Sequence, residues 1–313
     1  MLKNGKMMLV IGAVISVIVL SFISFSYAKN KPTVVVVLKG TDSQYWKIMK
    51  AGLEKGFKDF GIDGKIVIPS EATPKKQVEL LKKTYSEKPD MIITAPHSKS
   101  VYPTLKTFTD IPILLVDTDL PLKNKTAYIG TDNTDLGKKA GAFLASQLQP
   151  GDKVAIIGGG LNFPVFMERV KGAAFSLQKA GIEIVATKTG ISDDPKDVQK
   201  AVSMVLRDQP DIKGVVTTHD GIALPVIKEF EKQGLFIPVI GPDGLSDMLQ
   251  LIADGTLPGT VAQNPYDMGY LSVETAMKVL KGENVEAFVN SGVDIIIQEN
   301  AQQRLDFYKK IVK

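Results

Sequence analysis

The chain has 313 residues, of which 44% are hydrophobic and 23% charged. This composition suits about two globular domains and excludes a disordered or fibrous protein. The formal net charge is only +4, without a dense run of lysine or arginine, so a nucleic-acid partner is not expected. The sequence contains no cysteine, which excludes disulfides, cysteine-based zinc sites and lipid attachment through an N-terminal cysteine.

The N-terminus has the pattern of an export segment. Lys3 and Lys6 precede an apolar stretch, residues 7–25, that carries no charge. Ser26-Tyr27-Ala28 has the spacing of a cleavage site, whereas the apolar stretch approaches membrane-spanning length. Residues 1–28 are therefore expected to be either a cleaved signal peptide or a retained signal anchor, and the absence of cysteine slightly favours the anchor. The rest of the chain is expected outside the cytoplasm, in the periplasm or on the outer face of the cytoplasmic membrane.

From residue 31 onward, short β-branched or aliphatic runs alternate with stretches of helical periodicity, which is typical of βα units around parallel sheets. The apolar runs predict buried strands at Thr33–Leu38, Met91–Thr94, Ile113–Val116, Val154–Ile157, Gly214–Thr217 and Pro238–Ile240. The amphipathic stretches have the length of crossover helices, and they predict helices at Gln44–Phe60, Lys75–Glu87, Asp135–Leu148, Val165–Ala180 and Lys196–Asp208.

The same plan occurs twice in the chain. Pro89-Asp90 and Pro210-Asp211 lie 121 residues apart and each precede an apolar run. The segments 111–117 and 237–243 also match, at an offset of 126 residues. Such a repeat predicts two similar α/β lobes, each built on a parallel sheet.

Polar residues follow equivalent strands of the two halves. Asp117 and Asp243 each come directly after a predicted strand, and so do His97 and His219, which lie 122 residues apart. Ligands of parallel sheets bind outside the carboxyl ends of the strands, and an ionised carboxylate can accept hydrogen bonds from two adjacent hydroxyls. Each aspartate also fits a simple turn residue, as in Pro242-Asp243-Gly244, but the repeat favours a shared site.

Aromatic rings open the first predicted helix. Tyr45 and Trp46, the only tryptophan, follow the first strand. They fit core residues at a helix start, but a flat ring at a strand's carboxyl end also packs against the apolar face of a sugar. Position favours the sugar-binding interpretation.

The second half carries a glycine-rich loop before its first helix. Gly158-Gly159-Gly160 is not followed by Gly-Lys-Ser/Thr, and Phe163 stands where the dinucleotide fingerprint requires its third glycine. A nucleotide cofactor is therefore not expected. Arg169 lies near the start of the helix that follows, and taken alone it is a weak candidate because most arginines at helix starts are solvated.

Motifs for catalysis are scarce. The chain has two distant histidines, no Gly-x-Ser-x-Gly elbow and no His-Glu-x-x-His pair. Two aspartates in one cleft also fit an acid and a base, as in glycosidases, but nothing near them in sequence favours that role over hydroxyl binding. We expect no catalytic residue, no metal site and no cofactor.

From Lys31 onward, ordered blocks of the sequence resemble the ribose/galactose-type periplasmic binding proteins, the substrate receptors of ABC sugar importers. Gln44-Tyr45-Trp46 is similar to the family's Pro-Phe-Phe, whose rings sandwich the sugar. Asp117 stands where the family's first hydroxyl-binding aspartate stands, and Gly130-Thr131-Asp132-Asn133 resembles the family's Ala-Ser-Asp-Asn at the first hinge crossing.

The second half carries further blocks of the resemblance. Arg169, three residues before Gly172, matches the family's ligand-binding arginine; Gly241-Pro242-Asp243-Gly244 is similar to Gly-Phe-Asp-Gly; and Thr260-Val261-Ala262-Gln263 resembles the stretch that ends in the binding glutamine. The sequence departs from the ribose receptors at His219, Pro242, Ala95 and Lys39, which replace an asparagine, a phenylalanine, an asparagine and a serine. The pattern of hydroxyl binding can therefore differ from that of ribose.

The resemblance implies an architecture and a set of ligand contacts. Two Rossmann-like lobes are joined by a hinge of three crossings, the N-terminal lobe comprising residues 33–131 and 264–291 and the C-terminal lobe residues 132–263 and 292–313. A ligand that touches both lobes would stabilise the closed state over the open one. The implied ligand-binding residues are Lys39, Tyr45, Trp46, Asp117, Thr131, Arg169, His219, Asp243 and Gln263.

The implied function is that of an extracytoplasmic receptor. It closes over a monosaccharide, a pentose or a hexose with xylose among the candidates, and presents it to an ABC permease. One alternative is a membrane-anchored co-receptor that signals sugar occupancy to a sensor histidine kinase, and another is a carbohydrate-active enzyme. LacI-type repressors have a related fold but begin with a helix-turn-helix, where this chain has its apolar segment, which excludes a transcriptional role.

Overall fold

The computed structural model describes residues 31–40, 43–160 and 164–312. Internal contacts divide the chain into residues 1–32 and residues 33–313. The predicted export segment, including its cleavage motif, lies outside the described residues, as do Thr41, Asp42 and Phe163. Within the described part of the chain, no helix combines the length and apolar character needed to cross a membrane.

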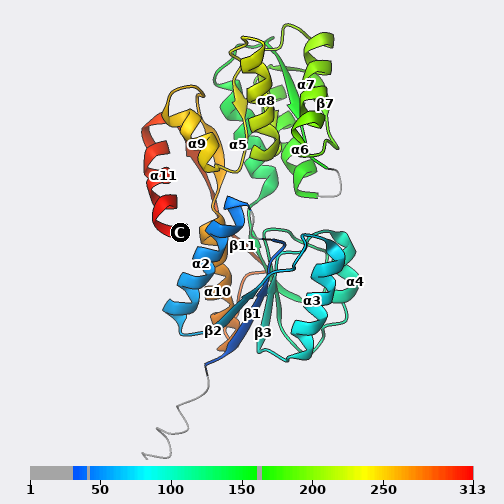
Figure 1. Ribbon diagram of the computed structural model, residues 1–313, viewed down its shortest axis with the longest axis vertical. Helices are drawn as coiled ribbons and strands as arrows, with labels where there is room; N and C mark the ends of the chain where they lie inside the picture. Colours follow the sequence, from blue (N-terminus) through cyan, green and yellow to red (C-terminus); the bar gives the residue numbers. More distant parts are fainter. Residues whose placement is uncertain (1–30, 41–42, 161–163, 313) are drawn as a thin grey trace, which may run out of the picture. The chain divides into compact units, whose positions relative to one another are not determined.

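The first lobe contains a six-stranded parallel sheet (Figure 1) in the order β2-β1-β3-β4-β5-β11. Its central strands are fully buried apart from Thr33, as expected for a sheet covered on both faces. The order reverses between β1 and β3, which is the point where open α/β sheets bind ligands. The strands are β1 (Thr33–Val37), β2 (Asp63–Val67), β3 (Met91–Thr94), β4 (Ile113–Val116), β5 (Lys125–Gly130) and β11 (Phe288–Asn290).

Helices cover both faces of this first sheet (Figure 1). One face packs against α2 (Gln44–Phe60) and α10 (Pro265–Leu280), and the other against α3 (Pro74–Ser86), the 3-10 helix η1 (Lys99–Val101) and α4 (Tyr102–Leu105). Alternate residues of β1 point to opposite faces, because Val36 packs with the α2 side and Val37 with the α3 side. Each fully buried valine or leucine contributes roughly 1.5–3 kcal/mol, so the alternation fixes the register of the strand.

The second lobe repeats this plan with a parallel sheet in the order β7-β6-β8-β9. This order matches the order β2-β1-β3-β4 within the sheet of the first lobe. The predicted fold class, two similar α/β lobes, is confirmed. The strands are β6 (Lys153–Ile157), β7 (Glu183–Lys188), β8 (Gly214–Thr217) and β9 (Val239–Ile240). One face packs against α5 (Asn133–Ala145) and α6 (Pro164–Lys179), and the other against α7 (Pro195–Asp208), α8 (Asp220–Lys232), α9 (Ser246–Ala253) and α11 (Gln298–Ile311).

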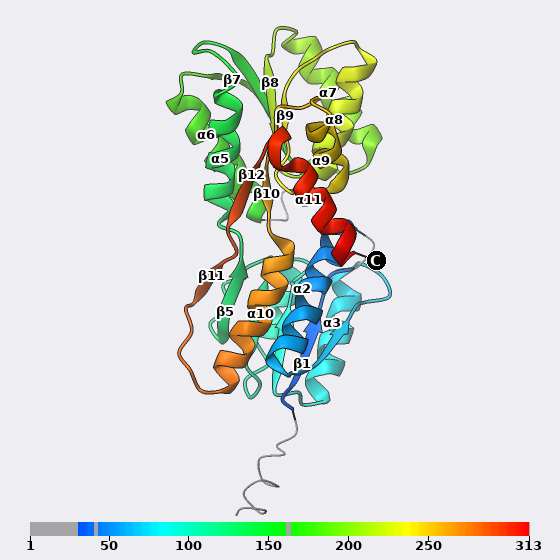
Figure 2. The same cartoon turned by 90° about the vertical axis from the view of Figure 1, so that its left-hand side faces the viewer.

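Three connections join the two sheets. β10 (Thr260–Gln263) and β12 (Val293–Ile296) pair antiparallel, with Gln263 opposite Val293 (Figure 2). The chain leaves the first sheet after β5, returns through β10 into α10, and leaves again from β11 into β12. The lobe boundaries proposed from the sequence stay a prediction.

In the first lobe, α2 and α10 pack backbone to backbone through glycines. A Cβ atom on Gly52 would lie 2.0 Å from the carbonyl oxygen of Tyr266, and one on Gly269 would lie 2.3 Å from that of Met49. Any side chain at either position would therefore push the helices apart. The contact brings the start of α2, with Tyr45 and Trp46, against the start of α10.

The second lobe uses the same device between α5 and α6. A Cβ atom on Gly137 would lie 2.2 Å from the carbonyl oxygen of Arg169, and one on Gly172 would lie 2.2 Å from that of Thr134. The close contact fixes the turn of α6 that carries Arg169 against the start of α5.

Replacing Gly52 by alanine is expected to lower the free energy of unfolding by about 1–3 kcal/mol, because the added methyl group forces α2 and α10 apart. Helix propensity acts in the opposite direction, since alanine is favoured over glycine by about 1 kcal/mol. Urea denaturation measures the difference, with Lys47→Ala at an exposed position of the same helix as the control. A Gly52→Ala variant as stable as the wild type would contradict the close helix contact.

Candidate functional site

The candidate residues from the sequence lie in segments that follow strand ends. Lys39 follows β1, Tyr45 and Trp46 begin α2, Asp117 follows β4, Thr131 follows β5, Arg169 lies in α6, His219 follows β8, Asp243 follows β9 and Gln263 ends β10. The structure gathers most of them into two groups, one around Asp117 and one around Asp243. Ligand contact at these residues stays a prediction.

The Asp117 cluster consists of Lys39, Tyr45, Trp46, Asp117 and Thr118. The Lys39 ammonium donates to Asp117 Oδ2 at 2.7 Å and to Thr118 Oγ1 at 2.6 Å. Thr118 Oγ1 donates in turn to Asp117 Oδ2 at 2.8 Å, and the Tyr45 hydroxyl donates to Asp117 Oδ1 at 2.9 Å. One carboxylate thus accepts from a cation and two hydroxyls.

The backbone of Asp117 is in an unusual conformation. Its φ is 64°, in the left-handed region that non-glycine residues seldom adopt. Its N–H donates to the carbonyl oxygen of Ile129 at 3.0 Å, and its carbonyl oxygen accepts from the Tyr128 hydroxyl at 3.0 Å. Strain of this kind persists only where surrounding contacts hold it, and here two β5 residues do so.

Burial and charge act in opposite directions on the Asp117 cluster. Burial raises the pKa of Asp117, but the charge of Lys39 and the hydrogen bonds from Lys39, Thr118 and Tyr45 outweigh it, so that the pKa lies below its usual range. Burial and then the charge of Asp117 raise the pKa of Tyr45 well above its usual range. The phenol therefore stays protonated and serves as a donor.

Trp46 is half-buried beside this cluster. The Lys39 ammonium lies 5.3 Å from the centre of its ring, within the range of a cation–π contact. The Tyr45 ring meets it edge-on, with centroids 5.2 Å apart and planes at 80°. The orientation of the indole is thus fixed by two neighbours.

The Asp243 cluster consists of Thr131, Asn133, Arg169, Asp220, Asp243 and Gln263. Arg169 donates from Nε to Asn133 Oδ1 at 2.9 Å and from Nη1 to the Thr218 carbonyl oxygen at 2.7 Å, and Nη1 lies 3.5 Å from Asp243 Oδ1. Its side chain is 7% exposed. Buried guanidinium groups require such partners.

Asp243 is also tied to two of the hinge crossings. Gln263 Nε2 donates to Asp243 Oδ1 at 2.7 Å, and Thr131 Oγ1 donates to Gln263 Oε1 at 3.0 Å. The side-chain amide of Gln263 thus links the crossings after β5 and β10, and it also donates a hydrogen bond to the Asp243 carboxylate.

Asp220 is a member of this cluster that the sequence analysis did not select. It is 0% exposed, and its oxygens accept from the backbone N–H groups of Asp243 at 3.2 Å and Leu245 at 2.7 Å. Its own N–H donates to Asp243 Oδ2 at 3.2 Å. Burial first, and then the charge of Asp243, raise the pKa of Asp220 to about 7. The available signal in the sequence was its place directly after His219, which stands where the ribose receptors have an asparagine.

His219 is held on three sides. Its ring stacks on Phe166, with centroids 4.6 Å apart and planes at 6°. Nε2 lies 2.9 Å from Asp193 Oδ1, and Nδ1 lies 3.1 Å from Thr218 Oγ1. The hydrogen bond with His219 lowers the pKa of Asp193, although burial opposes the shift.

His97 has a different environment from His219. Its backbone N–H donates to Gln77 Oε1 at 2.7 Å, and its Nε2 lies 2.9 Å from the carbonyl oxygen of Ala72. The matched positions of the two histidines in sequence therefore do not correspond to matched surroundings.

A pair of hydrogen bonds links the two lobes beside the Asp117 cluster. Gln44 Nε2 donates to Ser246 Oγ at 2.5 Å, and Ser246 N–H donates to Gln44 Oε1 at 2.8 Å. The adjacent Leu245 packs against the first-lobe core. The starts of α2 and α9 are thus in direct contact.

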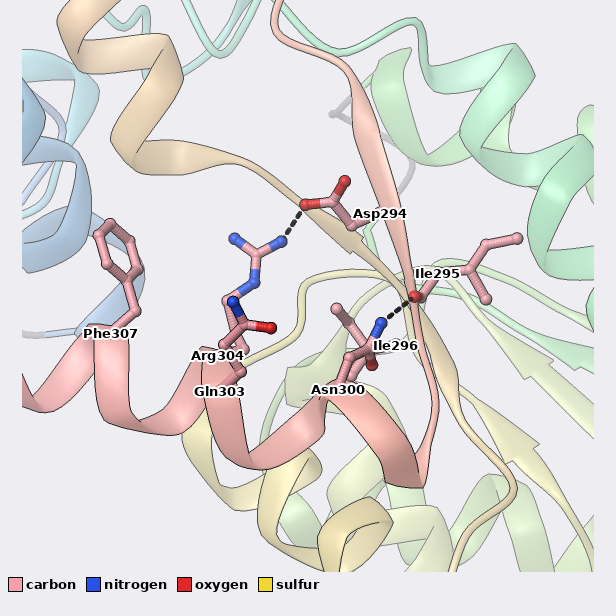
Figure 3. Close-up of a pocket in the computed structure, with 7 residues that line it drawn as sticks. All are labelled: Asp294, Ile295, Ile296, Asn300, Gln303, Arg304 and Phe307. Carbon is pink, nitrogen blue, oxygen red and sulfur yellow. Dashed lines mark hydrogen bonds and ion pairs between the residues drawn. The ribbon is translucent and has the colours of Figure 1, made fainter.

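A separate pocket lies between β12 and α11 (Figure 3), and none of the candidate residues lines it. Arg304 donates to Asn264 Oδ1 at 2.9 Å and pairs with Asp294. Because Asn264 precedes α10 and Asp294 lies on β12, one guanidinium group ties α11 to two hinge crossings. The lining residues are Asp294, Ile295, Ile296, Asn300, Gln303, Arg304 and Phe307.

The described residues contain no group of three or more histidine, aspartate or glutamate side chains arranged to hold a metal ion. The clusters around Asp117 and Asp243 instead combine carboxylates with ammonium, guanidinium, amide and hydroxyl donors. The charges of the two clusters act on a common group, since Asp117, Asp243 and Arg169 all shift the pKa of Tyr45. Such an arrangement suits a small ligand with several hydroxyl groups.

Known proteins share this architecture. The D-allose-binding periplasmic protein of Escherichia coli (strain K12) is 29% identical over 266 residues, covering 80% of this chain and 85% of its own. The ribose import binding protein of Bacillus subtilis (strain 168) is 26% identical over 275 residues, covering 87% and 89%. A solved glucose-galactose binding protein from Geobacillus stearothermophilus is 29% identical, with a TM-score of 0.80 over 87% of this chain and 99% of that one. Residues 34–284 match the family model described as periplasmic binding protein domain, and the chain therefore belongs to this family.

Proposed function

We propose that the protein is an extracytoplasmic receptor that closes over one neutral monosaccharide and presents it to an ABC sugar importer. The observation that carries the proposal is the pair of largely buried aspartates, Asp117 and Asp243, whose side chains are 15% and 13% exposed. They follow the equivalent strands β4 and β9, and each lies beside a cation. The names of the relatives, which are receptors for allose, ribose, and glucose and galactose, support a sugar as the ligand.

Both aspartates retain room for a ligand hydroxyl. A carboxylate has about four acceptor positions. Asp117 uses three of them on Lys39, Thr118 and Tyr45, and Asp243 uses three on Gln263, Arg169 and the N–H of Asp220. About one position on each carboxylate therefore remains for a sugar hydroxyl.

Donors are available as well. Lys39 uses two of its three N–H groups on Asp117 and Thr118, and Arg169 Nη2 has no hydrogen-bond partner among residues 31–40, 43–160 and 164–312. Sugar hydroxyls both donate and accept, so they can use the free acceptors and these donors together. The pairing of Lys39 with Asp117 and of Arg169 with Asp243 balances the charges, which favours a neutral sugar over an acidic or amino sugar.

Closure of the two lobes would couple binding to recognition by a permease. A ligand that contacts both aspartates stabilises only the conformation in which they face each other. The network from Thr131 through Gln263 to Asp243 links the proposed second-lobe contact to two crossings, which would act as the hinge. We also propose that the protein is exported, since the related D-allose-binding protein is named as periplasmic.

We propose binding without conversion of the ligand. Asp220, whose pKa is raised to about 7, is the residue with the titration expected of a general acid. It is 0% exposed, however, and both of its oxygens accept backbone N–H groups. Its geometry is that of a structural partner of the Asp243 loop.

The purified protein is expected to bind one neutral pentose or hexose per chain and to release it unchanged. Isothermal titration calorimetry measures the stoichiometry and affinity, and chromatography of the recovered sugar detects conversion. A sugar acid or amino sugar of the same ring geometry is expected to bind at least about tenfold more weakly, because an uncompensated buried charge costs free energy. Turnover, or no binding across pentoses, hexoses and cyclitols, would contradict the proposal.

Replacing Asp243 by alanine is expected to weaken sugar binding by about 2–5 kcal/mol, because Arg169 and Gln263 lose their common acceptor. A double-mutant cycle with Arg169→Met should give a coupling of about 0.5–3 kcal/mol. Asp211→Ala is the control, since its carboxylate pairs with Lys153 at 2.8 Å but is 56% exposed. Wild-type affinity in Asp243→Ala would show that this residue is only a turn former.

A further inference from the structure

The ammonium group of Lys39 is fixed in place. It donates to Asp117 and Thr118 at 2.7 and 2.6 Å, and it lies 5.3 Å from the centre of the Trp46 ring. Its side chain is only 15% exposed, as is that of Asp117. Thr118 accepts from Lys39 and donates to Asp117, so the cation and the carboxylate are linked both directly and through a hydroxyl.

The two largely buried aspartates, Asp117 and Asp243, depend on different partners. Arg169 lies 3.5 Å from Asp243 and directs shorter hydrogen bonds to Asn133 and Thr218. Asp243 relies mainly on the neutral amide of Gln263, at 2.7 Å. Asp117, in contrast, has a cation at 2.7 Å, and without Lys39 only neutral hydroxyls would remain on its carboxylate.

The backbone that carries the Asp117 carboxylate is fixed by its neighbours. The left-handed backbone at φ 64° is held from both sides, by Ile129 through the N–H and by Tyr128 through the carbonyl oxygen. Without Lys39, a carboxylate that keeps its present position, 15% exposed, would have no counter-charge in contact with it. Such a group avoids the cost by taking up a proton.

The surroundings of Asp117 define what Lys39 must balance. Burial is the largest influence on the pKa of Asp117 and raises it, and the charge of Lys39 is the next and lowers it. Among the residues that the structure describes, the other titratable groups that hydrogen-bond to the carboxylate or its backbone are the phenols Tyr45 from α2 and Tyr128 from β5. Burial raises the pKa of both, so they stay neutral.

More distant charges offer no substitute for Lys39. Arg169 and Asp243 of the second lobe act on Tyr45 with opposite signs. Asp119, two residues beyond Asp117, is itself paired with Lys125. Lys39 is thus the cation in direct contact with the Asp117 carboxylate among the residues that the structure describes.

We propose that Lys39 is a positioning residue: it is the resident counter-ion of Asp117 and keeps this buried carboxylate ionised, so that the first lobe offers a ligand hydroxyl the same acceptor across a wide range of pH. The ligand part of this inference rests on the proposed function. The state of Asp117 in the free protein does not, and it can be tested without any sugar.

The ligand-free test is thermal unfolding of the full-length protein at several pH values. With Lys39 present, the folded pKa of Asp117 is lowered, so its stabilising effect is lost as pH falls. In Lys39→Met the folded pKa should be raised, so stability is lost as pH rises above the unfolded value near 3.9. The difference in Tm between wild type and Lys39→Met should therefore grow from about pH 5 to about pH 8.

Three further variants isolate the interaction. In an Asp117→Asn background, Lys39→Met should change Tm by the same amount at every pH in this range. Lys39→Arg keeps the charge and should restore the wild-type pH profile. Lys153→Met, which removes an exposed pair with Asp211 of similar length, 2.8 Å, should give a small and constant difference.

The outcomes are decisive in either direction. A Tm difference that is constant, or that shrinks as pH rises, would overturn the inference. Should Lys39→Met fail to fold at about pH 8, folding at about pH 5 and rescue by Asp117→Asn would support the inference, and failure of both would overturn it.

Measurements of sugar affinity at several pH values separate this inference from the proposed function. Between about pH 8 and about pH 5, the sugar affinity of Lys39→Met should fall relative to that of the wild type by up to tenfold per pH unit below the raised pKa of Asp117. The titration of Asp220, whose pKa is about 7, is common to both proteins and cancels in this comparison. A wild type that binds no monosaccharide would defeat the proposed function while the Tm profiles still decide the role of Lys39. Normal wild-type binding with parallel pH profiles in Lys39→Met would defeat only the inference.

Discussion

Burial of two carboxylates at equivalent strand ends is the constraint on which the site depends. A carboxylate removed from water is unstable unless cations and hydrogen-bond donors replace its hydration. Asp117 meets this condition with Lys39 at 2.7 Å, and Asp243 with Gln263 at 2.7 Å and Arg169 at 3.5 Å. The two lobes share a sheet topology but place their charges differently, so the two proposed ligand acceptors are chemically distinct.

Close contacts between helices hold the residues that surround the two carboxylates. Glycines bring α2 against α10 and α5 against α6, and each pair carries candidate residues at the end nearest the strand tips. The contact of Gly137 with the backbone of Arg169 means that the position of the guanidinium is set by helix packing as well as by its hydrogen bonds. In the proposed function, closure would act on groups that are already oriented, which would lower the entropy cost of binding.

Much of the fold could be predicted from the sequence, because buried parallel strands and amphipathic helices give strong local patterns. The limits of α2 were predicted as observed, and the repeat of Asp117 and Asp243 located equivalent strand ends. The edge strands β2 and β7 were missed, since their exposed and half-buried residues give a weak apolar signal. Asp220 and the left-handed φ of Asp117 were missed because both depend on partners distant in sequence.

The central claim is that a neutral sugar is held between Asp117 and Asp243. A crystal structure of the protein with its best-binding monosaccharide tests this claim most directly. The account predicts one sugar between the lobes, with hydroxyl groups within about 3 Å of a carboxylate oxygen of each aspartate and with the Lys39 ammonium still on Asp117. A sugar bound elsewhere, or one that contacts neither carboxylate, would contradict it.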